Sequence, residues 1–244
     1  MSRLSAVLLA TDYPPRSGGI ARLLDELVRG TEDTVDWRVL DVRAESPRQV
    51  PASGWRATRW LLAVPAGDRL VVCGHPYLAA PAVMTARLAR APLGSIAYGR
   101  ELMGLRPAHH VALRALRHSD RVVAISRHTA RCVRGLGVAE DRVRVVAPLF
   151  RPSWTGRFPP RPRRDGDGLR VIAITRLSEG YKNIELLLHA AQVLGPTGVI
   201  ERLTIDGGGP RLEALRARAR ALGELDERDF LADWSEPSAS IVLR

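Results

Sequence analysis

The chain has 244 residues, 45% of them hydrophobic and only 5% aromatic, and it carries a formal net charge of +11. This length allows one large hydrophobic core or two smaller ones. The positive charge suggests nucleic acid or an anionic membrane as a partner. The arginines are spread along the chain without a long basic run interleaved with aromatic residues, so we expect no nucleic acid partner. Peripheral contact with a membrane stays open.

Cysteine content and hydropathy narrow the class of protein further. Cys73 and Cys132 lie far apart and lack the spacing of metal ligands, so we expect two thiols of a reducing compartment and no metal site. No segment approaches the ~20 apolar residues of a transmembrane helix. We therefore expect a cytoplasmic protein, or one that is peripheral to the inner face of the membrane.

The first 150 residues alternate between strand-like and helix-like segments. Apolar runs predict strands at residues 5–10, 37–42, 69–73, 95–98, 122–125 and 142–147. Apolar segments of helical type occur at residues 20–28, 78–88, 109–116 and 127–136, the last with Ser126 as N-cap. Residues 43–58, rich in Pro, Ser and Arg, are predicted to be a surface excursion. This alternation predicts a Rossmann-like domain with a doubly wound parallel sheet over residues 1–150.

Three loops of this domain carry candidate site residues. Gly18 and Gly19 precede the helix at residues 20–28, where they let the backbone approach a ligand, although the glycines alone favour an ordinary strand-to-helix turn. His75 follows the third predicted strand and is either a site residue or an ordinary strand-end histidine. Arg100 and Glu101 follow the fourth predicted strand and are weaker candidates.

The second half of the chain begins with a change in composition. Residues 151–168 are rich in proline, arginine and glycine, which predicts a linker between domains. A new α/β run follows, with strands predicted at residues 169–175 and 202–206 and near 229–232, and helices at 183–194 and 210–222. Residues 206–210 form a second glycine-rich turn between strand and helix. We therefore expect a second, incomplete Rossmann-like domain over residues 169–244.

The loop after the first strand of this second domain contains two cations, Arg176 and Lys182. Lys182 is the only lysine in the chain, since every other basic residue apart from histidine is arginine. Two fixed cations at the carboxyl end of a strand and next to a helix N-terminus are suited to an anionic ligand. The alternative is that both are merely solvated loop residues.

Four segments in this order resemble the GT-B glycosyltransferases, in particular the retaining family 4 group that includes mannosyltransferases. They are residues 12–20, with a Pro-Pro-x-x-Gly-Gly loop; residues 120–129, with Val-Val-Ala-Ile-Ser; residues 175–183, like a Gly-Arg-Leu…Lys-Gly donor loop with Thr175 and Asn183 in place of glycines; and residues 205–210, like a Gly-x-Gly-Pro turn. The resemblance covers nearly the whole chain. It implies a GT-B fold with an acceptor domain followed by a donor-binding domain.

The resemblance also implies a reaction and a set of site residues. The reaction is metal-independent transfer of a sugar from a nucleoside-diphosphate sugar to a glycolipid, polysaccharide or natural-product acceptor, with retention of configuration and no cofactor beyond the donor. The donor diphosphate would contact Gly18, Gly19, Arg176 and Lys182. His75 would be the catalytic candidate, and Arg100 and Glu101 would lie on the acceptor side.

Departures from the family pattern limit these expectations. Tyr98 stands where some members carry a histidine, and the family's Glu-x-Phe-Gly-x-x-x-x-Glu segment is missing. We therefore expect a C-terminally truncated second domain. The alternative function is a non-catalytic remnant or accessory subunit of such an enzyme. A dinucleotide oxidoreductase is disfavoured because no Gly-x-Gly-x-x-Gly follows the first strand.

Overall fold

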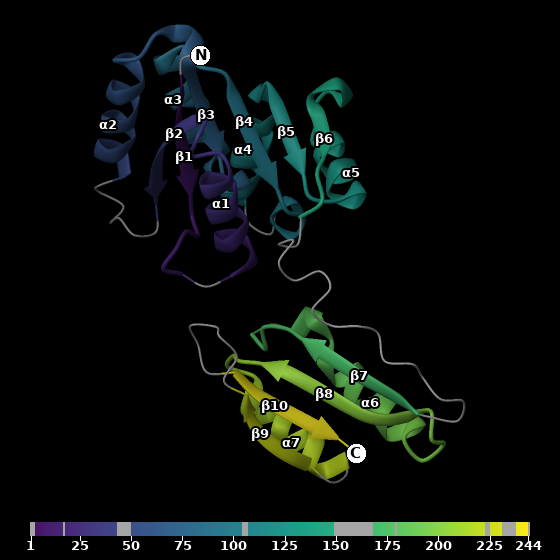
Figure 1. Cartoon of the computed structure of the whole chain (residues 1–244). Helices are drawn as coiled ribbons and strands as arrows, with labels where there is room; N and C mark the ends of the chain where they lie inside the picture. Colours follow the sequence, from purple (N-terminus) through teal and green to yellow (C-terminus); the bar gives the residue numbers. More distant parts are fainter. Residues whose placement is uncertain are drawn as a thin grey trace. The chain divides into compact units, whose positions relative to one another are not determined.

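The structure is a computed structural model that describes residues 3–16, 18–42, 50–103, 107–148, 168–178, 180–222, 225–230 and 238–243. The chain divides into two compact units, Met1–Pro152 and Ser153–Arg244 (Figure 1). Apart from Gly168, the predicted linker at residues 151–168 lies outside the described residues. Its role as a linker therefore stays a prediction.

The first unit contains a six-stranded sheet in which every pair of neighbouring strands is parallel. The strand order is β2-β1-β3-β4-β5-β6. The strands are β1 (Leu4–Ala10), β2 (Val35–Asp41), β3 (Arg69–Cys73), β4 (Leu93–Ala97), β5 (Arg121–Ala124) and β6 (Val143–Val145). The helices between them are α1 (Gly19–Gly30), α2 (Val50–Leu62), α3 (Ala79–Ala89), α4 (Pro107–Ala115) and α5 (Arg127–Gly135). This confirms the predicted doubly wound sheet.

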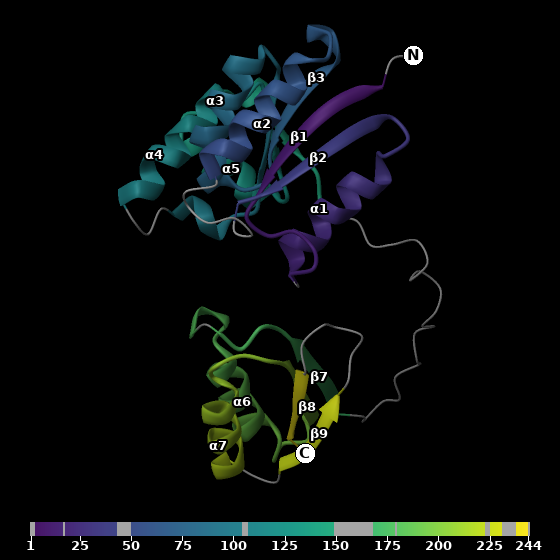
Figure 2. The same ribbon diagram turned by 90° about the vertical axis from the view of Figure 1, so that its left-hand side faces the viewer.

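Strand β1 shows why the sheet is covered on both faces. Its residues from Ser5 to Ala10 are all buried, as expected of a central parallel strand. Leu8 and Ala10 pack in a cluster with Leu24 of α1, whereas Val7 and Leu9 belong to the cluster that contains residues of α2, α3, α4 and α5. Figure 2 accordingly shows α1 on one side of the sheet and α2, α3 and α4 on the other.

One prediction for the first unit is wrong. Residues 50–58, expected in a surface excursion, form most of helix α2, while residues 43–49 lie outside the described part of the chain. Ala57 and Leu61 of α2 are fully buried and anchor the helix on the sheet. Pro51 lies in the first helical turn, where a backbone N–H has no partner within the helix, so this proline does not interrupt the helix.

The second unit has a four-stranded mixed sheet with the order β7-β8-β10-β9. Strands β7 (Leu169–Ile174) and β8 (Ile200–Gly207) are parallel, but β10 (Ser238–Leu243) is antiparallel to both β8 and β9 (Leu225–Phe230). Helices α6 (Ile184–Leu194) and α7 (Leu212–Leu222) lie on the same side of this sheet in Figure 2. Their buried residues share one core with Leu203 and Ile205 of β8. Strand β10 was not predicted, and β9 begins and ends earlier than expected.

Candidate functional site

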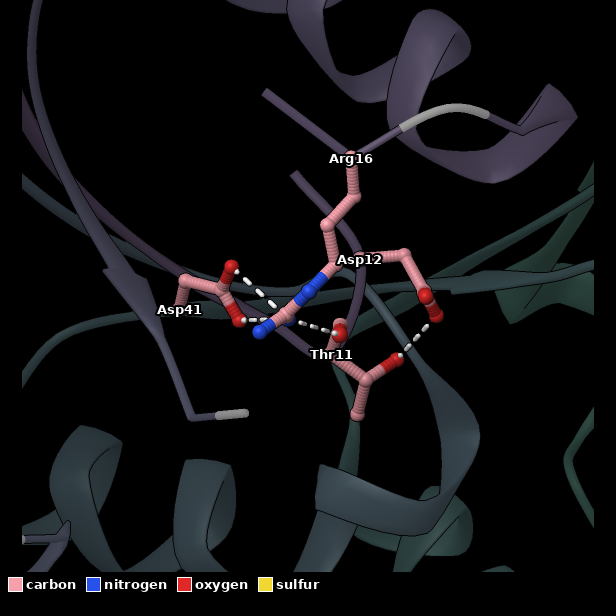
Figure 3. A network of polar contacts seen from close by, with 4 residues as sticks. All are labelled: Thr11, Asp12, Arg16 and Asp41. Carbon is pink, nitrogen blue, oxygen red and sulfur yellow. Dashed lines mark hydrogen bonds and ion pairs between the residues drawn. The ribbon is translucent and has the colours of Figure 1, made fainter. Parts of the chain in front are cut away.

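In the first unit, the candidate residues lie in loops at the carboxyl end of the parallel sheet. The loop after β1 is held by Arg16, which the sequence analysis did not single out. The Nη1 of Arg16 donates to both carboxylate oxygens of Asp41 at 3.1 Å and to the carbonyl of Thr11 at 3.2 Å (Figure 3). The hydroxyl of Thr11 donates to the carboxylate of Asp12. These contacts tie the glycine-containing loop to the end of β2.

Gly18 and Gly19 lie at the start of α1, as predicted. Gly18 is the N-cap residue and makes no side-chain capping contact, and the first turn of α1 contains no acidic residue. A Cβ built on Gly19 would meet no described atom within 4 Å. The first N–H groups of an α-helix lack partners within the helix and favour negative charge. This end of α1 therefore combines backbone donors that have no partner within the helix with space beside Gly19 among the described residues.

His75, which follows β3, has an evident structural role. Its Nδ1 accepts a hydrogen bond from the backbone N–H of Tyr77 at 3.3 Å and so caps the 3-10 turn Pro76–Leu78. The ring is half-buried, and its centroid lies 4.9 Å from the ring of Tyr77 and 6.3 Å from that of Tyr98. Any contact of this imidazole with a ligand would therefore use Nε2 rather than Nδ1.

Tyr98 holds the turn before His75. Its hydroxyl donates to the carbonyl of Gly74 at 2.8 Å. Burial raises the pKa of Tyr98, and the negative charges of Glu101 and Asp12 raise it further. The phenol therefore stays protonated and remains a hydrogen-bond donor at ordinary pH.

Glu101 stabilises the turn after β4. Its Oε1 accepts the backbone N–H groups of Tyr98 at 2.6 Å and Gly99 at 2.8 Å, and the hydroxyl of Thr129 donates to the carbonyl of Tyr98 at 3.2 Å. One carboxylate oxygen of Glu101 is thus occupied by the protein's own backbone. Arg100 beside it is exposed. An acceptor-side role for either residue stays a prediction.

In the second unit, Arg176 and Lys182 lie on the loop between β7 and α6, and both are exposed. Between them, the side chain of Leu177 is buried in the core of the unit and anchors the loop. Lys182 ends the short 3-10 turn Gly180–Lys182, directly before Asn183, whose side chain makes no capping hydrogen bond at the start of α6. Two cations therefore precede a helix N-terminus, as the sequence predicted.

The glycine-rich turn after β8 supports this loop through its backbone. Leu177 donates its N–H to the carbonyl of Gly208 at 2.8 Å, and Arg211 donates its N–H to the carbonyl of Leu177 at 3.1 Å. Gly207 and Gly209 have φ of 154° and 148°. A Cβ at Gly207 would lie 1.8 Å from the carbonyl oxygen of Thr175, and one at Gly209 would lie 2.6 Å from that of Leu177. These glycines are needed for the contact between the two loops.

An ion pair reinforces the same contact. The guanidinium of Arg211, just before α7, is paired with the carboxylate of Glu185 in the first turn of α6. The acidic residue nearest the start of α6 is thus neutralised by an arginine. Among the residues that the structure describes, there is no group of three or more His, Cys, Asp or Glu side chains that could hold a metal ion.

Within each unit the structure brings some of the predicted residues close together. His75 and Glu101 both contact Tyr98 in the first unit, and Arg176 and Lys182 lie on one loop in the second. The roles of Arg16 and Tyr98 were not predicted from the sequence. An arginine within a glycine-containing loop was a usable signal for the first. The hydrogen bond from Tyr98 to Gly74, 24 residues away, had none.

Comparison with known proteins gives the class of fold. No protein-family model matches the chain, and no curated protein matches it either. The chain is similar to the apo structure of WaaB, a lipopolysaccharide outer core galactosyltransferase, with a TM-score of 0.64 at 16% identity over 90% of this chain and 65% of WaaB. It is similar to Anabaena HepE in complex with UDP-glucose, with a TM-score of 0.61 at 14% identity over 90% of this chain and 66% of HepE.

A third structure, apo OtsA, gives a TM-score of 0.51 at 14% identity over 90% of this chain and 70% of OtsA. The chain thus spans 65% and 66% of the lengths of WaaB and HepE. With the two α/β units described above, these likenesses show that the chain has the GT-B fold. No helix in the described part of the chain is long and apolar enough to cross a membrane.

Proposed function

We propose that the chain is a glycosyltransferase of the retaining family 4 type, which moves a sugar from a nucleoside-diphosphate sugar to an acceptor. The acceptor would be a glycolipid, a polysaccharide or a natural product, and it would bind to the first unit. The observation that carries the proposal is the loop between β7 and α6. It presents two exposed cations, Arg176 and Lys182, from a backbone that is fixed by the glycine-rich turn. The structure of HepE with UDP-glucose, which has a similar fold, supports a donor of this class.

The chemistry of the leaving group explains why such a loop is useful. As the sugar departs, negative charge builds on the diphosphate and needs donors that are already aimed at it. Arg176 offers a planar fork to two phosphate oxygens, and Lys182 offers a compact point charge. The N–H groups at the start of α6 add a fixed partial positive charge. In this proposal these groups stabilise the leaving diphosphate without a metal ion and without a further cofactor.

In the first unit, the start of α1 and the turn that carries His75 would take part in ligand binding. Space beside Gly19 leaves room for a ligand near the first N–H groups of α1. His75 would contact the donor sugar or the acceptor, and the hydrogen bond that its Nδ1 accepts from Tyr77 would orient the ring. Tyr98 would act as a positioning residue that fixes this turn through Gly74.

Nucleotide binding tests the proposal directly. Isothermal calorimetry with UDP and with GDP should show that Arg176→Ala and Lys182→Ala each weaken binding at least about tenfold, which corresponds to ~1.4 kcal/mol. Arg218→Ala, which removes an exposed arginine from α7, is the matched control and should leave the affinity unchanged. Unchanged affinity in both loop variants would contradict the assignment.

A second candidate is a non-catalytic accessory subunit or remnant of such an enzyme. The observation that favours it is β10, which pairs antiparallel with β8 inside the second unit, so the sheet of the proposed donor domain is not the parallel sheet of a complete Rossmann-like domain. Incubation of the purified chain with a panel of nucleotide sugars separates the two candidates. Release of UDP or GDP supports the enzyme, whereas a chain that neither binds nor hydrolyses them supports the accessory role.

A further inference from the structure

Helices α2 and α3 form one continuous piece of the surface of the first unit. They pack against each other on the same face of the sheet, and they lie side by side in Figure 2. Arg69, at the start of β3, joins their ends. Its guanidinium donates to the carbonyl of Leu62 in α2 at 3.3 Å, to that of Ala89 in α3 at 2.6 Å, and to that of Val64 at 2.8 Å. The ends of α2 and α3 are therefore held within reach of one side chain.

The outward side of these two helices is unusually apolar. Among the described residues of the first unit, six large hydrophobic side chains are exposed, and four of them lie on α2 and α3. Trp55 is 56% and Leu62 45% exposed on α2, and Met84 is 64% and Leu88 56% exposed on α3. Spacings of seven and of four residues place each pair on one stripe of its helix. The buried residues of both helices face the same sheet, so the exposed residues of both helices lie on the sides that the sheet does not cover.

The charged residues of this surface are all basic. Four exposed arginines accompany the apolar side chains, namely Arg56 and Arg59 on α2 and Arg87 and Arg90 at the end of α3. Asp68 is the only acidic residue between positions 46 and 100, so neither helix contains a carboxylate. We call these four arginines and the four apolar residues Trp55, Leu62, Met84 and Leu88 the α2–α3 surface.

We propose that the α2–α3 surface docks on an anionic lipid membrane. Tryptophan and aliphatic side chains enter the boundary between head groups and acyl chains, while arginines bind the lipid phosphates beside them. Long arginine side chains can cover apolar surface with their stems and keep the guanidinium at the level of the head groups. Nucleic acid would use the arginines but would not need exposed Leu and Met. This proposal rests on the α2–α3 surface alone and does not depend on the proposed glycosyl transfer.

Vesicle sedimentation with the full chain tests the proposal. We expect the chain to pellet with vesicles of phosphatidylcholine mixed with phosphatidylglycerol and to stay in solution with phosphatidylcholine alone. The double variants Trp55→Ser/Leu88→Ser and Arg56→Gln/Arg59→Gln should each lower the partition coefficient at least about tenfold. Leu186→Ser and Arg218→Gln in the second unit are matched controls, with Leu186 58% exposed, and should bind like the original chain. Circular dichroism should show that all variants are folded.

Several results would overturn the proposal. Failure of the original chain to bind anionic vesicles would do so, as would equal loss of binding in the controls. Binding that the arginine variant loses and the Trp55→Ser/Leu88→Ser variant keeps would indicate a purely electrostatic contact, and parallel behaviour with random duplex DNA would assign it to nucleic acid. A dimer seen by light scattering that the Trp55→Ser/Leu88→Ser variant abolishes would assign the surface to a second copy of the chain.

Discussion

The loops at the carboxyl ends of the strands are held in different ways in the two units. In the first unit, side chains hold the backbone: Glu101 binds two N–H groups, Tyr98 binds the carbonyl of Gly74, and Arg16 joins the loop after β1 to the end of β2 through Asp41. In the second unit, backbone holds backbone, through the contact between the loop of Leu177 and the glycine-rich turn.

This difference determines which residues each unit needs to keep its loops in place. In the first unit, polar atoms of side chains hold the turns, as do Oε1 of Glu101 and Nδ1 of His75. In the second unit, glycines bring the loops together, and the side chains of Arg176 and Lys182 on these loops are exposed. The sensitive positions of the second unit are therefore its glycines, whereas those of the first unit are polar side chains.

The largest expected effect is that of Gly207→Ala. The new Cβ would overlap the carbonyl oxygen of Thr175 at 1.8 Å and would sit at a φ of 154°, so the two loops must separate. We expect a loss of about 3 kcal/mol or more in the stability of the second unit. Hydrogen exchange followed by mass spectrometry should show faster exchange in residues 175–178 and 205–211.

The control for this experiment is Gly135→Ala in α5, where a Cβ would meet nothing within 4 Å. Alanine in a helix is favoured over glycine, so this variant should be as stable as the original chain or slightly more so. Unchanged exchange in Gly207→Ala would show that the backbone contact between the loops is not what holds them.

Glu101→Ala should have the next largest effect, this time in the first unit. It leaves the N–H groups of Tyr98 and Gly99 without their carboxylate partner, which should cost about 2–3 kcal/mol. Thiol labelling of Cys73 in a Cys132→Ser background can report it, because burial raises the pKa of Cys73 to about 12 and the buried thiol reacts only when the unit opens.

The conservative variant Glu101→Gln keeps an oxygen that can accept both N–H groups. It should therefore recover most of the protection of Cys73 that Glu101→Ala loses. Equal labelling of the alanine variant and the original chain would show that the carboxylate does not hold the turn.

Tyr98→Phe removes one hydrogen bond to Gly74 and should cost about 1 kcal/mol at neutral pH. The stability difference should also depend on pH, because the pKa of Tyr98 is higher in the folded chain than in the unfolded chain. This pKa difference contributes fully to the stability of the fold below the pKa of the unfolded chain, which is about 10. That contribution is lost as the pH rises above about 10. The pKa of Cys73 is also raised, so the contribution of Cys73 to stability falls with rising pH as well. This fall occurs in the same direction in the original chain and in Tyr98→Phe.

The measurement is a set of denaturant titrations from pH 8 to 11. The stability difference between the original chain and Tyr98→Phe should shrink at the alkaline end, because only the original chain contains the phenol that resists ionisation. A difference that grows with pH would contradict this account of Tyr98.

The smallest effect should come from Asp41→Asn. The pair with Arg16 is partly exposed, with 36% of the arginine side chain accessible, so we expect a change below about 1 kcal/mol. Salt should reduce it further. Thermal melts at low and high ionic strength can measure it, with the exposed Asp36→Asn as control. A change above about 2 kcal/mol would show that the Arg16–Asp41 pair stabilises the loop after β1 more than expected of a partly exposed ion pair.

How far the fold follows from the sequence depends on whether a segment is organised locally. Residues 6–10 and 71–73 are buried in strands that have a neighbour on both sides, and their unbroken apolar runs predicted strands. Helix α2 was missed because Pro51 and Gly54 interrupt its apolar stripe. Strand β10 was missed because it is fixed by pairing with β8, more than thirty residues earlier in the chain.

Whether a residue of the candidate site could be predicted also depends on whether its contacts are local in sequence. Arg176 and Lys182 were predicted because their loop, the strand before it and the helix after it are contiguous in sequence. The bracing role of Glu101 is also local, but its neighbour Tyr98 reaches Gly74 only through the packing of β3 beside β4. Sequence patterns carry no direct signal for such a contact. Tyr98 therefore entered the sequence analysis only as a departure from the family pattern.

Arg69 orders part of the first unit before the unit binds a partner. Its three hydrogen bonds fix the ends of α2 and α3 and the carbonyl of Val64 before any partner arrives. Segments that are ordered beforehand lose less conformational entropy on association, which leaves more of the interaction energy for affinity. A chain without this guanidinium would still display the same apolar and basic side chains, but it would have to order two helix ends each time it met a surface.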